Sequence, residues 1–141
     1  MKMNSIIGIA LFASVFFGQS AHAQCNPDES LKTSVTTLAD GFNFVKSYTI
    51  AAPANKESVE FSYVFTKGTQ YMLTLADAGS ANSIVVTLYD SERRKVASNK
   101  IQGTIASALV YPCNATGIYY MEFSFDAGSS RCGASALGFK K

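Results

Sequence analysis

From residue 42 onward the chain carries large apolar residues at every second position, in short stretches separated by turn-forming residues. The run from Glu60 to Phe65 is typical, because its aromatic residues alternate with smaller or polar ones. Side chains of a β-strand point alternately to the two faces of a sheet, so this period predicts strands rather than helices. The stretches with this pattern are residues 42–50, 59–65, 70–76, 84–89, 95–98, 105–111, 117–125 and 133–139.

Strands that recur about every ten residues, with turn chemistry between them, are typical of two antiparallel sheets packed face to face. We therefore predict an all-β fold for residues 42–141, an antiparallel, jelly-roll-like β-sandwich of about eight strands. Residues 24–41 form a polar N-terminal segment in which residues 28–38 could make a short helix, and no helix is long enough to cover a sheet. The residues expected to fill the core are Phe61, Phe65, Leu73, Leu75, Leu88, Met121, Phe123 and Phe125.

The first 23 residues have the three parts of a secretory signal peptide. Lys2 supplies a positive charge, residues 6–17 form an apolar stretch, and Ala21-His22-Ala23 fits the small-x-small rule for signal peptidase. The apolar stretch is shorter than the roughly 20 residues that a helix needs to span a bilayer. We therefore expect residues 1–23 to be removed, which leaves a periplasmic or secreted protein without a membrane span.

Histidine is absent from the chain expected after cleavage, because the only histidine is His22. Without an imidazole, neither Ser-His nor Cys-His catalysis is possible, and no histidine can bind a metal. Once Lys2 leaves with the signal peptide, 11 Lys and Arg residues remain against 10 Asp and Glu residues, which argues against a nucleic-acid-binding protein. We expect a protein that is not an enzyme. The weaker alternative is a carbohydrate-active hydrolase that uses paired carboxylates, with Glu122 inside an expected strand as the candidate.

Three cysteines, Cys25, Cys113 and Cys132, remain in the chain expected after export. An oxidising compartment favours a disulfide bond. The strand expected over residues 117–125 separates Cys113 from Cys132 by roughly 27 Å, whereas bonded cysteines have Cα atoms within about 7 Å of each other. We therefore expect Cys25 to pair with one of the other two. The third cysteine, if exposed, could join two copies of the chain, and the wide spacing of the three argues against a zinc site.

Short strand-like motifs carry a resemblance to a known family. The runs are Phe65–Tyr71, Val85–Asp90 followed by Val96–Ser98, and Ala115–Tyr120. They resemble the G-x-x-Y, V-x-L-Y-D and G-x-Y-Y strands of the bacterial pre-peptidase C-terminal domain, over residues 59–125. The chain also resembles small secreted proteins of unknown function from Bacteroidetes-type bacteria. The resemblance implies a jelly-roll-like, non-catalytic module attached to exported enzymes or surface proteins, some members of which bind calcium or a polymer such as collagen.

Three aspartates, Asp77, Asp90 and Asp126, lie where expected strands end and loops begin. Oxygen ligands on neighbouring loops can bind calcium. Single acidic residues are also ordinary turn formers, and no stretch resembles an EF-hand loop. We therefore expect no cofactor, with calcium at these aspartates as the alternative.

Surface residues on the expected sheets are candidates for contacting a ligand. Tyr120 is expected to point out of the sheet, opposite to its core-facing neighbours, and Tyr89 can do so too. Such tyrosines stack on sugars or anchor a protein partner. Arg93 and Arg94 lie in a charged turn that could meet an anionic polymer. Glu122 is expected to face outward like Tyr120.

The sheet fold, the export signal and the lack of histidine predict a non-catalytic exported binding or adhesion module. Its partner is expected to be a protein or a polysaccharide of the cell envelope or the extracellular space. The alternative is a structural protein of the envelope whose copies associate through an exposed sheet edge or the unpaired cysteine. Both interpretations leave the identity of the partner open.

Overall fold

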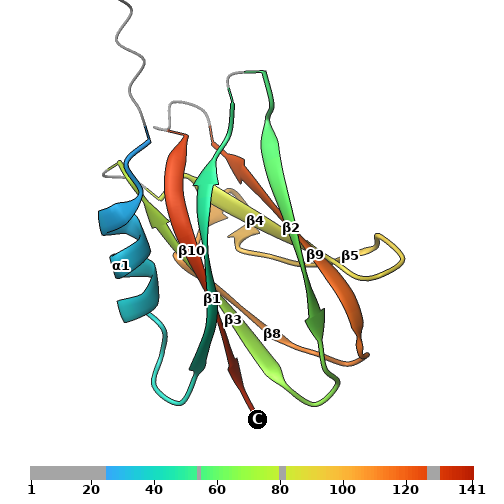
Figure 1. Ribbon diagram of the computed structural model, residues 1–141. Helices are drawn as coiled ribbons and strands as arrows, with labels where there is room; N and C mark the ends of the chain where they lie inside the picture. Colours follow the sequence, from blue (N-terminus) through green and yellow to red (C-terminus); the bar gives the residue numbers. More distant parts are fainter. Residues whose placement is uncertain (1–24, 54, 80–81, 127–130) are drawn as a thin grey trace, which may run out of the picture.

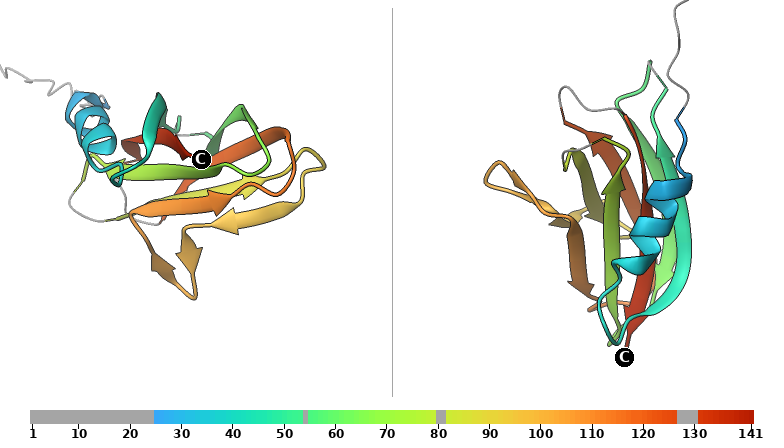
Figure 2. Two further views of the ribbon diagram at one scale, coloured as in Figure 1. Left: turned by 90° about the horizontal axis from the view of Figure 1, so that it is seen from below. Right: turned by 90° about the vertical axis from the view of Figure 1, so that its left-hand side faces the viewer.

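In the part of the chain that the structure describes, two four-stranded antiparallel sheets pack face to face, and one helix lies on the outside of the first sheet (Figure 1; Figure 2). The computed structural model describes residues 25–53, 55–79, 82–126 and 131–141. The expected signal peptide, residues 1–23, lies outside the described residues. The prediction of an all-β antiparallel sandwich is confirmed.

The sheets are built from strands that are distant in the sequence. Sheet A contains, in order, β1 (Asn43–Ala51), β10 (Cys132–Lys140), β3 (Gln70–Asp77) and β8 (Ala108–Pro112). Sheet B contains, in order, β2 (Ser58–Phe65), β9 (Gly117–Phe125), β4 (Ile84–Tyr89) and β5 (Lys95–Ser98). A separate short ribbon contains β6 (Lys100–Ile101) and β7 (Thr104–Ile105).

The strand pairs are nested along the chain. β1 pairs with β10, β2 with β9, β3 with β8 and β4 with β5, all antiparallel. The chain is thus one long hairpin that has been rolled up, and the pairs β10–β3 and β9–β4 complete the two sheets. This strand order is that of an eight-stranded jelly roll.

One expected strand, residues 105–111, is divided into β7 and β8. The division lies at Ala106, whose N–H donates to the Asn99 carbonyl at 2.9 Å. The Asn99 side chain in turn donates to the Ala106 carbonyl at 2.8 Å. These contacts bend the chain at Ala106, and the following residue, Ser107, accepts a hydrogen bond from the N–H of Leu75 on β3. The other expected strands match the observed ones to within one residue at each end.

Phe65 lies at the centre of the core, fully buried between Tyr71 and Tyr119, with ring centroids 3.9 and 4.8 Å away. Burial of such apolar surface is the main force that holds two sheets together. Phe61 and Phe125 also pack against the core as expected, but both are only half-buried, because Phe61 is on the edge strand β2 and Phe125 is the last residue of β9. The expected core residues that are buried are Phe65, Leu73, Leu75, Leu88, Met121 and Phe123.

Helix α1 (Asp28–Thr36) packs on the outer face of sheet A, against β10 and β3 (Figure 2). The hydroxyl of Thr74 on β3 donates a 2.7 Å hydrogen bond to the carbonyl of Ser34, and both residues are buried. The expectation that no helix covers a sheet is therefore wrong. A helix rich in Ser and Thr has weak intrinsic propensity, but tertiary packing overrides it. None of the described helices is long and apolar enough to cross a membrane.

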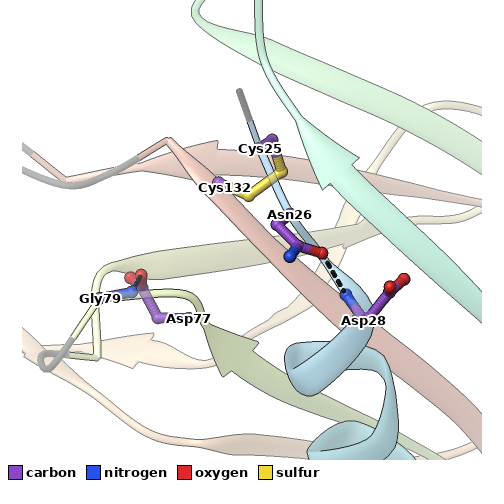
Figure 3. Close-up of a disulfide and its surroundings, with 6 residues drawn as sticks. All are labelled: Cys25, Asn26, Asp28, Asp77, Gly79 and Cys132. Carbon is purple, nitrogen blue, oxygen red and sulfur yellow. Dashed lines mark hydrogen bonds between the residues drawn. A yellow bond between two sulfur atoms is a disulfide. The ribbon is translucent and has the colours of Figure 1, made fainter. Parts of the chain in front are cut away.

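A disulfide joins Cys25 to Cys132, with the Cα atoms 5.4 Å apart (Figure 3). The prediction that Cys25 pairs with one of the other two cysteines is confirmed. Cys113 is free and buried, and its thiol donates to the Ala115 carbonyl at 3.2 Å. Burial also raises the pKa of the neighbouring Tyr119 hydroxyl above its ordinary value. Because Cys113 is not at the surface, it does not offer the exposed thiol considered for linking copies.

Candidate functional site

The outer faces of the two sheets differ in what covers them. Helix α1 covers part of the outer face of sheet A, whereas no described helix packs on sheet B (Figure 2). Alternate residues of β2 and β9 therefore remain at least partly exposed, among them Val64, Tyr120 and Glu122. An uncovered sheet face that carries aromatic and apolar side chains is a surface on which a ligand can bind.

The strand register brings residues from three elements together on this face. Tyr120 on β9 pairs with Tyr89 on β4. Glu122, two residues further along β9, pairs with Glu60 on the opposite neighbour, β2. Arg93 reaches the same place from the hairpin that follows β4. Four of the five predicted ligand-contacting residues thus lie close together: Tyr89, Arg93, Tyr120 and Glu122. We call these four residues, together with Glu60, the outer-face cluster.

Arg93 is positioned by the hairpin between β4 and β5. Its N–H donates to the Asp90 carbonyl at 2.9 Å, and its backbone adopts the left-handed conformation with φ of 64°. The guanidinium carbon lies 3.6 Å from the centre of the Tyr120 ring. The Nη1 group donates to a carboxylate oxygen of Glu60 at 2.7 Å. Stacking and ion pairing together fix the direction of the guanidinium.

The contact with Arg93 also balances the charges of the outer-face cluster. Glu60 and Glu122 are opposite each other on neighbouring strands, an arrangement of like charges that destabilises a sheet. Arg93 compensates the charge of Glu60, and its hydrogen bond to Glu60 raises the pKa of Arg93 above its ordinary value. The Arg93 side chain is 57% exposed, so water screens the pair and the guanidinium stays open to a ligand.

Two apolar residues extend the cluster along the same face. Val64 on β2 and Ile118 on β9 are cross-strand partners, with exposed fractions of 55% and 46%. Adjacent exposed apolar side chains often mark a surface that another molecule covers. Sequence reasoning missed both residues, and also Glu60. The alternation of β2 shows that Glu60 and Val64 face outward, but it does not show which strand lies beside them.

Arg94, the remaining candidate, does not join the outer-face cluster. Its Nε donates to Asp90 at 2.9 Å, and its Nη2 lies 3.5 Å from a carboxylate oxygen of Glu92. Asp90 also accepts backbone N–H bonds from Arg94 and Glu92, at 2.9 and 3.0 Å. The backbone N–H and then the guanidinium of Arg94 hold the pKa of Asp90 below its ordinary value. Asp90 and Arg94 therefore stabilise the hairpin that carries Arg93.

Replacing Asp90 with asparagine should lower the melting temperature at neutral pH and leave little difference at strongly acidic pH. A carboxylate whose pKa is lowered by folding stabilises the folded state above its unfolded-state pKa. This contribution is lost as the pH falls through the lowered pKa. Melting curves of both proteins over the acidic range measure the effect.

The variant Arg94→Ala is the control, because it removes the guanidinium and keeps the backbone N–H of residue 94. The NMR-detected pKa of Asp90 should therefore stay below its ordinary value in this variant. Equal melting temperatures of wild type and Asp90→Asn at neutral pH would contradict the role assigned to Asp90.

The three aspartates considered for calcium lie on separate turns. Asp77 accepts a 2.7 Å hydrogen bond from the N–H of Gly79 (Figure 3). Asp126 forms an ion pair with Lys100 at 3.3 Å, and Asp90 lies in the β4–β5 hairpin. Within the described ranges, no three acidic, cysteine or histidine residues gather into a group that could hold a metal ion. The hydrogen bonds of Asp77 and Asp90 are those of turn-forming residues.

Comparison with known proteins gives little further information. No protein-family model and no curated protein matches this chain. Among solved structures, a similar chain is described as "Glycosylation Associate Protein (Gap123) complex from Streptococcus agalactiae", with a TM-score of 0.38 and 16% sequence identity. The likeness covers 72% of this chain and 39% of that chain, so this chain spans well under half of its neighbour's length. The resemblance to pre-peptidase C-terminal domains stays a prediction.

Proposed function

We propose that this protein is an exported, non-catalytic binding module that recognises a polypeptide through the outer-face cluster. The observation that carries the proposal is the exposed guanidinium of Arg93, which lies over the Tyr120 ring and is directed by its bond to Glu60. Arginine and tyrosine are among the residues that most often dominate the binding energy of protein interfaces. A preorganised arginine loses less conformational freedom when a partner binds.

The composition of the site favours a polypeptide over a polysaccharide. The guanidinium of Arg93 occupies a face of Tyr120 on which a sugar ring would stack. Its remaining N–H groups match the carboxylates and main-chain carbonyls of a protein. The exposed pair Val64 and Ile118 adds apolar area beside them, which side chains of a partner can cover.

Two features support export. Residues 1–23 have the pattern of a signal peptide. The Cys25–Cys132 disulfide is of the kind that persists in oxidising compartments. A non-catalytic role is supported by the sequence, which has no histidine outside the expected leader.

Cross-linking capture followed by affinity measurement tests the proposal. The protein, produced by export into an oxidising compartment, is used as bait against the envelope fraction and the medium of its own organism. We expect one enriched protein. With that partner purified, Arg93→Ala and Tyr120→Ala should each weaken binding about 30-fold, which corresponds to about 2 kcal/mol for a hot-spot residue. Isothermal titration calorimetry measures the two Kd values against that of the wild type.

Ile101→Lys is the matched surface control. Ile101 is 68% exposed on the β6–β7 ribbon, away from the outer-face cluster, so its substitution should leave binding unchanged. Circular dichroism melting curves establish that each variant folds. Equal binding by the wild type and both cluster variants would reject the site, and enrichment of a polysaccharide without a protein would reject the ligand class.

A further inference from the structure

We propose that β2 is a self-complementary edge through which two copies of this protein pair, strand to strand, into a two-fold dimer. β2 is an outer strand of sheet B, and no described strand pairs with its free side. The unpaired N–H and C=O groups of an edge strand can bond a strand of another chain. Four strands hold such edge positions in the two sheets: β1, β8, β2 and β5. Figure 1 shows β1 and β2 along one side of the sandwich.

The other three edge strands carry features that oppose pairing with a second chain. β1 has a register irregularity between Phe44 and Lys46, and Lys46 is exposed. β8 has only five residues and ends at Pro112, which has no N–H to donate. β5 has only four residues and begins with the exposed Lys95. Bulges, prolines, lysines and short strands are the usual means by which proteins protect sheet edges.

β2 has none of these protective features. It spans eight residues, contains no proline or lysine, and pairs with β9 without a register shift. Its one charged residue, Glu60, is already bound by Arg93 of the same chain. Val64, close to its end, is 55% exposed. A long, regular and weakly charged edge strand with exposed apolar side chains is the kind that pairs with another strand.

The sequence of β2 is complementary to itself in one antiparallel register, with Ser62 of one copy opposite Ser62 of the other. In this register Phe61 of one copy lies opposite Tyr63 of the second copy, which brings two aromatic side chains together. Glu60 lies opposite Val64, so the glutamates of the two copies do not face each other. Residues directly opposite each other in an antiparallel pair point to the same face of the sheet. The outward-facing side chains of both copies therefore lie on one face of the joined sheet, and the inward-facing side chains lie on the other.

Charges just beyond the ends of β2 select the same register. Glu57 precedes the strand and Lys67 follows it, and both are exposed. Neither side chain forms an ion pair with another described residue. With Ser62 opposite Ser62, Glu57 of each copy comes beside the β2–β3 turn of the other copy, which carries Lys67, so the two-fold axis produces two matched pairs. Any other antiparallel register separates both pairs.

The dimer joins the two copies of sheet B into one continuous sheet. The outer faces of both copies then form one surface that carries two outer-face clusters. The interface uses the same strand of each copy, so the assembly closes at two chains and does not extend into a fibre. Ligand binding by a single cluster does not require the dimer, so the dimer and the proposed function can be tested separately.

Sedimentation velocity over a rising concentration series tests the dimer, with protein exported into an oxidising compartment. We expect the wild type to show a monomer–dimer equilibrium that weakens as salt is added, because exposed charge pairs are screened. Glu57→Lys and Lys67→Glu should each weaken dimerisation about tenfold, since each variant replaces two attractive pairs with two repulsive ones. A mixture of the two variants should recover wild-type association, because the mixed dimer regains two Glu–Lys pairs.

Glu29→Lys and Lys32→Glu are the matched controls, because they make the same charge changes at exposed positions of α1. These variants should associate like the wild type. A wild type that stays monomeric up to millimolar concentration would overturn the proposal. The proposal would also be overturned if Glu57→Lys and Lys67→Glu each dimerised like the wild type, or if their mixture dimerised no more tightly than either variant alone.

Discussion

Replacing both Cys25 and Cys132 with alanine should lower the free energy of unfolding by about 5 kcal/mol. The disulfide joins residues that are 107 positions apart in the sequence. A cross-link over so long a loop removes a large part of the conformational freedom of the unfolded chain, which raises its free energy relative to the folded state. Urea denaturation followed by circular dichroism, under non-reducing conditions, measures the difference.

Local unfolding of the double variant should begin at helix α1, because Cys25 lies just before this helix and the disulfide anchors the N-terminal end of the helix to β10 (Figure 3). Hydrogen exchange should therefore speed up first at Leu31 and the rest of α1, and only later in β9. Cys113→Ala is the matched control, because it removes a buried thiol and keeps the disulfide; we expect a cost of about 1 kcal/mol. A double variant no less stable than Cys113→Ala would show that the disulfide contributes nothing beyond local packing.

Asn99→Ala should lower the free energy of unfolding by about 3–4 kcal/mol. Asn99 is 2% exposed, and its side chain makes three hydrogen bonds. Its Oδ1 accepts from the N–H of Val86 at 2.7 Å, and its Nδ2 donates to the carbonyls of Ile84 and Ala106 at 2.9 and 2.8 Å. Alanine leaves one backbone donor and two backbone acceptors without these partners, and each unsatisfied buried group costs about 1–3 kcal/mol. Urea denaturation of wild type and variant measures the loss.

Asn114→Ala is the control for Asn99→Ala, because Asn114 is an exposed asparagine in the turn between β8 and β9. This exposed substitution should change stability by no more than about 0.5 kcal/mol. Asn99→Asp keeps the acceptor for Val86 and removes both donors, so it should also destabilise the fold strongly. Equal free energies of unfolding for Asn99→Ala and Asn114→Ala would contradict the role assigned to Asn99, which is to stabilise the contact between β4 and the bend at Ala106.

The candidate site was only partly visible in the sequence. Period-two alternation identifies Tyr120 and Glu122 as outward-facing, because the direction of a side chain in a strand depends on its own position. It cannot identify Glu60 as the partner of Arg93, since the two are 33 residues apart and meet only when β2 and β4 pair with the same strand, β9. Val64 and Ile118 are missed for the same reason. Arg94 was expected to act with Arg93, but the local hydrogen bonds of the hairpin turn it towards Asp90 instead.

The fold class, the positions of most strands and the involvement of Cys25 in a disulfide could all be predicted from the amino-acid sequence. These properties follow from local rules: side-chain alternation, turn chemistry and the reach of a single strand. The nested order of the strands, the packing of α1 on sheet A and the convergence of the outer-face cluster could not be predicted, because they are set by tertiary packing. Strand order and contacts between distant residues depend on how whole faces of the sheets pack against each other. Packing on sheet A also stabilises helix α1, although the Ser- and Thr-rich sequence of this segment has a weak intrinsic helix propensity.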